Sequence, residues 1–210
     1  DTQEAKVSDM ARRIGYIFQD PNDQLFANSV EEEILFGLRN LDLSEEQVQK
    51  RADETIALFG LDEIRTVFPR FLARGDKQKV CIAAIVAMQP QIILLDEPTT
   101  GQDHRDSRQI MKLAQTLNEQ GITVLLVTHD IPNVANYARR TVLLNNGRLI
   151  KSAPTAEIIA DHELMISCSL VPPQITRLGL ALTEQGLRPE MTVEAMVAQV
   201  RYWLNGRKGA

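Results

Sequence analysis

The sequence predicts an α/β fold with a parallel sheet at its core and a small helical part after it. Two continuous apolar runs, at residues 92–95 and 122–127, are typical of buried strands, and a polar segment with helical character lies between them at residues 105–120. Strand, helix and strand in this order predict parallel neighbours in a sheet that is covered on both faces. From about Thr155 onward, apolar residues recur at helical spacing, which predicts helices there.

Other elements follow from local signals. Residues 13–19 form a short apolar stretch before a cluster of turn formers, which predicts a further strand. Ser44 and Gln47 have the spacing of a capping box, and Gly60 supplies a C-terminal cap for the helix that they open. Residues 75–88 are apolar nearly all round, so we expect a buried helix there.

An antiparallel hairpin is expected at the far end of the sheet. Residues 141–144 form a strand, the Asn146-Gly147 pair is a strong hairpin signal, and residues 148–151 form the returning strand. After this hairpin, Pro172-Pro173 should open one of the C-terminal helices.

Composition narrows the class of protein. The 210 residues are 44% hydrophobic and 24% charged, as in a soluble globular protein of one or two domains. A net charge of −5 provides no positive field for nucleic acid or anionic lipid, so we expect no nucleic acid partner. No apolar run approaches the roughly 18 residues that cross a bilayer, and we expect a cytoplasmic chain that reaches a membrane only through a protein partner. Cys81 and Cys168 stand in no metal-binding cluster and are expected to be reduced core residues.

Two adjacent carboxylates follow the apolar run at residues 92–95. In parallel sheets the ligand lies at the carboxyl ends of the strands. Asp96 could therefore hold Mg²⁺ there, while Glu97 could polarise an attacking water as a base. Taken alone, the same residues could merely end a strand and begin a turn.

Two more polar residues are expected at the same edge of the sheet. His129 follows the next strand and could sense a terminal phosphate by donating a hydrogen bond to it. Gln19 ends the strand at residues 13–19, and its amide could ligate Mg²⁺ or orient water. Either residue alone would more often be structural.

In order along the chain, these segments resemble the motifs of ABC ATPases. GYIFQDP at residues 15–21 resembles the Q-loop, IILLDEPTTGQD at residues 92–103 resembles the Walker B segment running into the D-loop, and VTHD at residues 127–130 resembles the switch-histidine segment. Residues 18–43 are similar to the energy-coupling factor ATPases, in which this segment receives the coupling helix of the membrane subunit. Residues 171–186 resemble the helical extension that the same subfamily uses for subunit pairing.

The segment LARGDKQ, at residues 72–78, stands where this family has its LSGGQ signature, and it matches only at Leu72 and Gly75. The resemblance implies that the signature and the D-loop contact a nucleotide held by the partner subunit, through Leu72, Ala73, Arg74, Gly75, Asp76 and Asp103. Ala73 cannot donate the hydroxyl of the family's serine. Arg74 restores positive charge near a phosphate, whereas Asp76 adds an unfavourable carboxylate unless a cation pairs with it. Residues 74–79 could otherwise be a solvated charge run.

The resemblance implies a partial P-loop NTPase fold of the ABC ATPase type. Residues 1–154 would form the ATPase domain, with a helical signature subdomain at about 27–90, and residues 155–210 a helical extension for pairing. ATP and Mg²⁺ would be the cofactors, and hydrolysis would occur between two head-to-tail subunits at the cytoplasmic face of the membrane. The second subunit could be a copy or a paralogue, and the altered signature and Gln102, where the family usually has Leu, favour a paralogue.

A transmembrane coupling subunit would dock near residues 19–26, where Leu25 and Phe26 could be docking anchors or ordinary core residues. The cargo would be a micronutrient, either a vitamin or a transition-metal ion.

None of the 11 glycines forms the family's phosphate-binding loop, GxxxxGK[ST]. We therefore expect a chain truncated before the Q-loop and inactive alone. Two alternatives remain open: a degenerate ABC domain that acts as a non-catalytic pairing partner, and an ABC ATPase with no role in transport.

Overall fold

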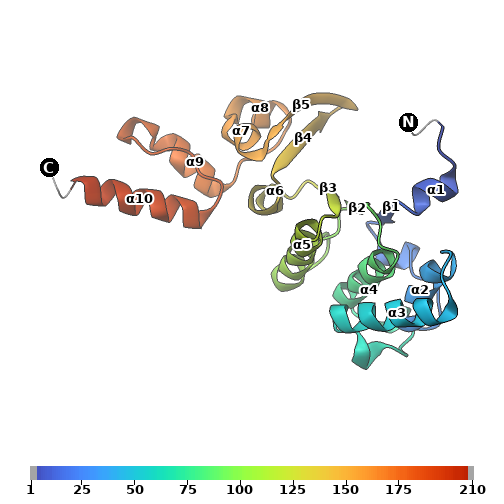
Figure 1. The fold of residues 1–210 in the computed structure, drawn as a ribbon. Helices are drawn as coiled ribbons and strands as arrows, with labels where there is room; N and C mark the ends of the chain where they lie inside the picture. Colours follow the sequence, from blue (N-terminus) through green and yellow to red (C-terminus); the bar gives the residue numbers. More distant parts are fainter. Residues whose placement is uncertain (1–3, 208–210) are drawn as a thin grey trace. The chain divides into compact units, whose positions relative to one another are not determined.

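The computed structural model describes residues 4–207. The chain divides into two compact units between Thr128 and His129 (Figure 1). The helices and strands of the first unit are α1 Val7–Ala11, β1 Ile14–Ile17, η1 Pro21–Asp23, α2 Val30–Arg39, α3 Glu45–Phe59, η2 Asp62–Ile64, η3 Pro69–Phe71, α4 Arg74–Ala87, β2 Ile92–Asp96, α5 His104–Glu119 and β3 Thr123–Val127. Those of the second unit are α6 Ile131–Tyr137, β4 Arg140–Asn145, β5 Arg148–Pro154, α7 Thr155–Ala160, α8 His162–Ser167, α9 Gln174–Ala181, η4 Thr183–Gln185 and α10 Val193–Arg207. The predicted domain boundary at residues 154/155 stays a prediction.

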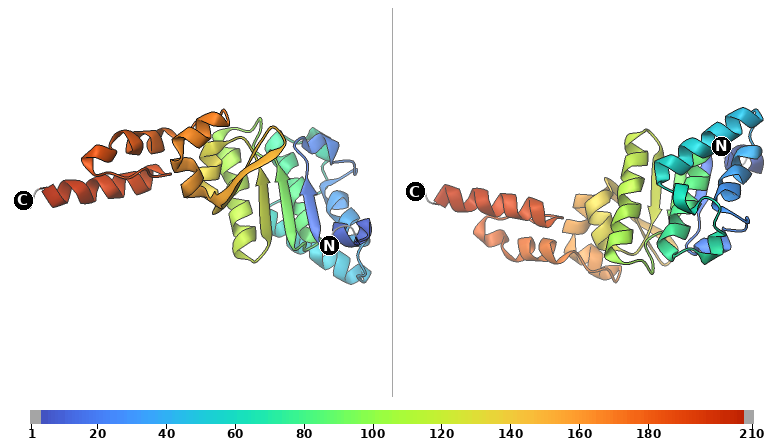
Figure 2. Two further views of the ribbon diagram at one scale, coloured as in Figure 1. Left: turned by 90° about the horizontal axis from the view of Figure 1, so that it is seen from above. Right: turned by 90° about the horizontal axis from the view of Figure 1, so that it is seen from below.

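A three-stranded parallel sheet forms the centre of the first unit. Its order is β1-β2-β3, and Ile17, Leu95 and Leu126 stand side by side across the three strands. The three strands lie next to one another in the left view of Figure 2. The predicted parallel strand–helix–strand unit is therefore confirmed as β2, α5 and β3.

Helices cover one face of this sheet. α4 contacts β1 and α5 contacts β3, and the side chains that point toward these helices, such as Ile17, Ile93 and Leu95, are buried. On the opposite face Tyr16 is 41% exposed, and Leu125 and Val127 are each 50% exposed. The described helices of the first unit therefore cover one face of the sheet, and coverage of the opposite face stays a prediction. A continuous apolar run shows that both faces suit burial, but it does not say what covers each one.

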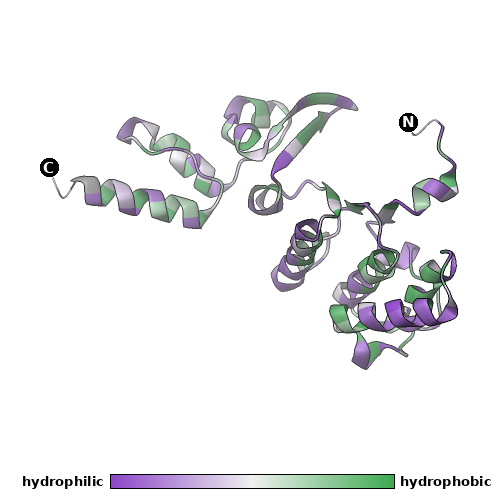
Figure 3. Cartoon of the chain, in the orientation of Figure 1, coloured by the Kyte–Doolittle hydropathy of each residue, from purple (hydrophilic) through white to green (hydrophobic). Residues whose placement is uncertain are grey.

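The helices α2, α3 and α4 pack around a common core with Ile34, Ile56 and Ile82 at its centre. The predicted capping box at the start of α3 is confirmed, because Ser44 Oγ accepts from the Gln47 main chain and Gln47 Oε1 accepts from the Ser44 main chain. Gly60 ends this helix in the left-handed region, at φ 62°. Purple, hydrophilic residues dominate α3 and α5 in Figure 3, as expected for surface helices with one buried face.

An ion-pair cluster ties α2, α3 and the loop after them together. The guanidinium of Arg65 contacts the carboxylates of Glu31 in α2 and Asp53 in α3, and Gln49 Nε2 donates to Glu31 Oε1 over 3.1 Å. The hydrogen bond from Arg65 lowers the pKa of Glu31 below its usual value. The cluster is only partly exposed, so solvent screens it less than an ordinary surface pair.

In the second unit, β4 and β5 form the predicted antiparallel hairpin, and Asn146 and Gly147 both have positive φ, at 50° and 71°. The hairpin is a two-stranded sheet of its own, so its predicted place at the end of the parallel sheet is wrong as far as the described strands show. Helices α7 and α8 cover one face of the hairpin. The buried contact consists of Leu143 from β4, Ile158 from α7 and Met165 from α8.

Helices follow the hairpin, as predicted. Pro173 is the N-cap residue of α9, and Trp203 Nε1 donates to the Gln185 carbonyl over 2.8 Å, which fixes α10 against the turn after α9. Both cysteines are free thiols: Cys81 is buried and Cys168 half-buried. Within residues 4–207, no helix combines the length and the apolar character that a membrane crossing requires.

The contact between β1 and α4 leaves no room for a side chain at Gly15, where a β-carbon would lie 2.1 Å from Ile85 Cγ2. We expect Gly15→Ala to destabilise the protein by about 1–3 kcal/mol, because the helix must shift to accept the methyl group. Denaturant unfolding measures the change. Gly37→Ala is the matched control, since its β-carbon would meet the flexible end of Met88. Equal effects of the two variants would contradict the packing described here.

The Arg65 cluster predicts a dependence of stability on pH. The pKa of Glu31 is lower in the folded protein than in the unfolded chain, where it is about 4.3. Glu31 therefore stabilises the fold above the unfolded-state pKa, and this stabilisation is lost as pH falls through the folded-state pKa. The free energy of unfolding of the wild type should exceed that of Glu31→Gln by about 0.5–1 kcal/mol at pH 7. This difference should shrink below about pH 4. Urea unfolding at several pH values checks this, with exposed Glu63→Gln as control. A difference between wild type and Glu31→Gln that stayed constant down to pH 3 would count against the cluster.

Candidate functional site

Glu97 stands at the point where the central strand β2 ends. Its φ of 44° is in the left-handed region, which is unusual for a residue with a side chain. Its main-chain N–H donates to the Val127 carbonyl over 2.9 Å, so the neighbouring strand β3 holds this conformation. The carboxylate oxygen Oε2 accepts from Thr100 Oγ1 over 3.1 Å and from Thr128 Oγ1 over 3.3 Å. Two hydroxyl groups from separate segments thus fix the carboxylate.

Asp96, the last residue of β2, is held by the strand on its other side. Tyr16 in β1 donates its hydroxyl to Asp96 Oδ2 over 2.6 Å. This hydrogen bond is the largest cause that raises the pKa of Tyr16 above its usual value. The sequence reasoning missed Tyr16, although it lies within the same GYIFQ segment as Gln19. It also missed Thr128, which directly follows β3, and Thr100, which lies four residues after the end of β2.

Gln19 lies at the same edge of the sheet as these carboxylates. β1 and β2 are parallel with Ile17 beside Leu95, and Gln19 and Glu97 each follow that pair by two residues. An open hollow of about 500 Å³ adjoins Gln19, and its lining consists of Phe18, Gln19, Asp20, Asp23 and Arg74. The topology therefore brings Gln19, Asp96 and Glu97 to one edge of the sheet.

His129 is the first residue of the second unit. Its neighbour Thr128 belongs to the first unit and contacts Glu97, so His129 is one residue along the chain from that contact. Asp130 follows as the N-cap of α6, where Oδ1 accepts from the Asn133 main chain over 3.1 Å. The role of His129 as a phosphate sensor stays a prediction.

The segment that stands in place of the signature opens the buried helix α4. Ala73 is its N-cap residue and provides no side-chain hydrogen bond to the helix, as its sequence implies. Arg74 Nη2 donates to the Gln19 carbonyl over 3.4 Å. Asp76 pairs with Lys79 over 3.7 Å, rather than with Arg74 or Lys77. The charged side chains in the first turn of α4 thus contact other groups of the same chain: Arg74 contacts the Gln19 carbonyl, and Asp76 pairs with Lys79.

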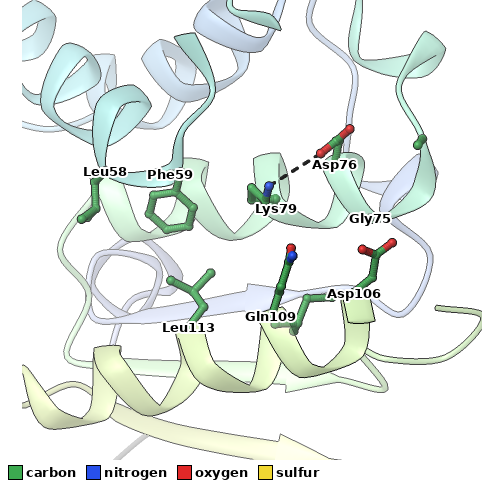
Figure 4. A pocket seen from close by; sticks show the side chains of 10 residues that line it. Leu58, Phe59, Gly75, Asp76, Lys79, Asp106, Gln109 and Leu113 are labelled. Carbon is green, nitrogen blue, oxygen red and sulfur yellow. Dashed lines mark ion pairs between the residues drawn. The ribbon is translucent and has the colours of Figure 1, made fainter. Parts of the chain in front are cut away.

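Asp76 and Lys79 border a pocket of about 250 Å³ between α3, α4 and α5 (Figure 4). Its lower wall in the figure is one face of α5, with Asp106, Gln109 and Leu113 pointing toward α4. Phe59 at the end of α3 closes the apolar end of the pocket. The pocket lies directly beside the first turn of α4.

Gly75 is pressed against the segment that follows Glu97. A β-carbon at Gly75 would lie 2.7 Å from Asp106 Oδ2 and 3.4 Å from Gln102 Oε1. Gln102 Nε2 is buried, and no hydrogen bond joins it to another atom in the described part of the chain. Asp103 is the N-cap of α5, and the main-chain N–H groups of Asp106 and Arg105 lower its pKa. The nucleotide contacts expected for Leu72, Ala73, Arg74, Gly75, Asp76 and Asp103 stay predictions.

The described residues contain no cluster of three or more His, Cys, Asp or Glu side chains that could hold a metal ion alone. Mg²⁺ in phosphate-transferring enzymes is held by only one or two carboxylates of the protein together with substrate phosphates, and it keeps several waters. Asp96 and Gln19 are oxygen donors of the right type.

Known proteins resemble this chain in sequence and in fold. The family described as "ABC transporter" matches residues 1–100. The energy-coupling factor transporter ATP-binding protein EcfA of Methanococcus maripaludis is 41% identical over 198 residues, which are 93% of this chain and 71% of that protein. A putative ABC transporter ATP-binding protein of Methanosarcina acetivorans is 40% identical over 178 residues, which are 85% of this chain but only 29% of that longer protein.

Two solved structures share the fold. CbiO1 from Clostridium perfringens, described as part of the ABC transporter complex cbiONQ, has a TM-score of 0.68 and 33% identity, over 83% of this chain and 69% of that one. A dimeric ATP-binding cassette in a post-hydrolysis state, bound to ADP and Pi, has a TM-score of 0.63 and 29% identity, over 73% of this chain and 69% of that one. The α/β fold with its parallel sheet is thus that of an ABC ATPase. The chain belongs to the ATP-binding proteins of ABC transporters, in the energy-coupling factor branch.

Proposed function

We propose that the complete protein hydrolyses ATP between two ABC subunits and thereby powers an energy-coupling factor importer for a micronutrient. The names of the relatives, EcfA and CbiO1, support the transporter type. The cargo, a vitamin or a transition-metal ion, would be chosen by a membrane-embedded binding subunit, so this chain would act on ATP and not on the cargo.

The observation that carries the proposal is the fixed carboxylate of Glu97. Hydrogen bonds from Thr100 and Thr128 hold it at the carboxyl end of β2. Phosphoryl transfer is catalysed mainly by positioning and by charge stabilisation, and a fixed carboxylate orients an attacking water and accepts its proton. Glu97 is thus the catalytic base in this proposal, and the hydroxyl groups of Thr100 and Thr128 hold its carboxylate.

Asp96 and Gln19 are the residues that would hold Mg²⁺ beside ATP. Mg²⁺ held there would supply positive charge that stabilises the negative charge developing on the phosphate oxygens. Tyr16 keeps Asp96 in place by donating to Oδ2. His129, which follows Thr128 in the chain, would donate a hydrogen bond to the terminal phosphate.

The first turn of α4 would face the nucleotide held by a second ABC ATPase subunit. Main-chain N–H groups at a helix N-terminus attract phosphate, and Leu72, Ala73, Arg74, Gly75 and Asp76 supply this turn. Asp103, which opens α5, would approach the same nucleotide. Because Ala73 lacks a hydroxyl group, this site would be weaker than one with serine, which favours a paralogue as the partner. Residues 155–210 would contribute to subunit pairing.

An exposed pair of aromatic rings marks the surface where a transmembrane coupling subunit would dock. Leu25 is buried at 2% exposure and belongs to the core, whereas Phe26 is 58% exposed. Phe26 packs edge-on against Phe36, which is 53% exposed, with ring centroids 4.7 Å apart. Buried Glu33 fixes this loop by accepting from the Phe26 and Ala27 main chains. Docking near residues 19–26 would keep the protein at the cytoplasmic face of the membrane as a peripheral subunit.

A second candidate function is a pairing domain that does not itself turn over ATP. The observation that favours it is the N-cap Ala73, which leaves the signature without its hydroxyl donor. The two candidates differ in whether Glu97 limits turnover.

Replacing Glu97 with Gln in the complete protein keeps the shape of the side chain and removes the base. We expect kcat for ATP hydrolysis to fall by about 10²–10⁴-fold, with ATP affinity unchanged. Steady-state hydrolysis and equilibrium nucleotide binding measure the two effects, and Glu119→Gln, on the exposed face of α5, is the control. Undiminished hydrolysis by Glu97→Gln would refute the catalytic assignment and leave the pairing domain as the better candidate.

The docking surface predicts a specific loss of assembly. Phe36→Asp should reduce co-purification with the transmembrane subunits at least tenfold, because it buries a charge in an apolar contact, while the folded ATPase stays soluble. Phe71→Asp is the matched control, since Phe71 is 83% exposed on a different loop. Equal losses for both variants would argue that the aromatic pair is not the docking site.

A further inference from the structure

One face of helix α4 is occupied by the loop that carries Gln19. Arg74, Lys77 and Cys81 recur at intervals of three and four residues, so they lie on one side of the helix. Arg74 Nη2 donates to the Gln19 carbonyl over 3.4 Å, Lys77 Nζ donates to Asn22 Oδ1 over 2.9 Å, and Cys81 Sγ lies 3.9 Å from the Pro21 carbonyl. Three successive positions of α4 thus contact three nearby positions of one loop.

That loop is itself a hydrogen-bonded turn. Asp20 Oδ1 accepts from the Asn22 main chain over 2.9 Å, and the Gln24 and Leu25 main chains donate to the Pro21 carbonyl over 3.2 and 3.0 Å. Because these hydrogen bonds hold the turn together, a displacement of one of its residues displaces the others. A contact made at Gln19 or Asn22 therefore affects the whole turn.

Arg74 also contacts the segment that follows Glu97. A β-carbon at Gly101 would lie 3.4 Å from both Cζ and Nε of Arg74, so the guanidinium packs directly on the Gly101 backbone, where φ is 72°. One side chain thus touches the loop of Gln19 and the loop between Glu97 and Asp103.

The charges of α4 are divided between two sides. Asp76 and Lys79 form an ion pair at the pocket between α3, α4 and α5, as Figure 4 shows. Arg74 and Lys77 are directed to the other side, where the contacts with Gln19, Asn22 and Gly101 lie. The basic residues in the altered signature are therefore engaged inside their own chain.

We propose that Arg74 and Lys77 are positioning residues that fasten the first turn of α4 to the loop of Gln19 and, through Arg74, to Gly101. The proposal rests on the proposed function insofar as Gln19 acts at the nucleotide. Any displacement of α4 by the partner subunit is then transmitted to the main chain of Gln19. The guanidinium of Arg74 serves this link and is not a ligand for the partner's phosphate.

Hydrogen exchange tests the link without using activity. In Arg74→Ala and in Lys77→Ala, the amides of Asn22, Gln24 and Leu25 should exchange about two- to tenfold faster than in wild type, the change expected for losing one hydrogen bond. Arg74→Lys keeps a cationic donor and should restore most of the protection. Arg108→Ala and Lys112→Ala, on the exposed side of α5, are the controls. Exchange unchanged at these three amides, or equally faster in the controls, would overturn the proposal.

Kinetics of the complete protein separate the link from a phosphate contact. A positioning role predicts that Arg74→Ala lowers kcat several-fold with KM for ATP changed less than twofold, whereas a phosphate ligand would raise KM. A raised KM with unchanged kcat would therefore overturn the proposal. If Glu97→Gln left hydrolysis intact, the catalytic assignment would fail, but the exchange experiment would still decide whether the link exists.

Discussion

The site depends on the parallel pairing of β1, β2 and β3. Because neighbouring strands run in the same direction and in register, Gln19, Asp96 and Glu97 leave the sheet at one edge although many residues separate Gln19 from the other two. The same pairing provides the Val127 carbonyl that holds Glu97 in its left-handed conformation. Strand pairing therefore fixes both where the carboxylate lies and how its backbone is bent.

Local signals in the sequence were enough to predict most elements. The capping box at Ser44, the Gly60 cap and the Asn146-Gly147 turn each depend on a few neighbouring residues, and the structure confirms all three. The residues Gln19, Asp96 and Glu97 could be predicted because their positions follow from strand ends in a parallel sheet.

The other features of the fold and the site depend on contacts between residues that are distant in the sequence, and sequence periodicity gives no information about such contacts. Apolar runs could not show that the described helices of the first unit cover only one face of the sheet, or that β4 and β5 form a sheet of their own. Leu25 and Phe26 are adjacent and similar in the sequence, yet one is buried and the other exposed. The hydrogen bond from Tyr16 to Asp96 joins two strands 80 positions apart in the chain.

The glycine of the altered signature, Gly75, also has a role in packing within the chain. A β-carbon at this position would meet the carboxylate of Asp106 and the side-chain oxygen of Gln102, so a larger residue would have to displace these side chains whether or not a nucleotide is ever bound there. Ala73 is exposed, whereas Arg74 contacts Gln19 and Gly101. The segment thus lacks the serine and the first glycine of the family's motif, while Gly75 has a packing role within the chain. Packing inside the chain is a sufficient reason for glycine at position 75, so this glycine is poor evidence that the altered signature serves hydrolysis.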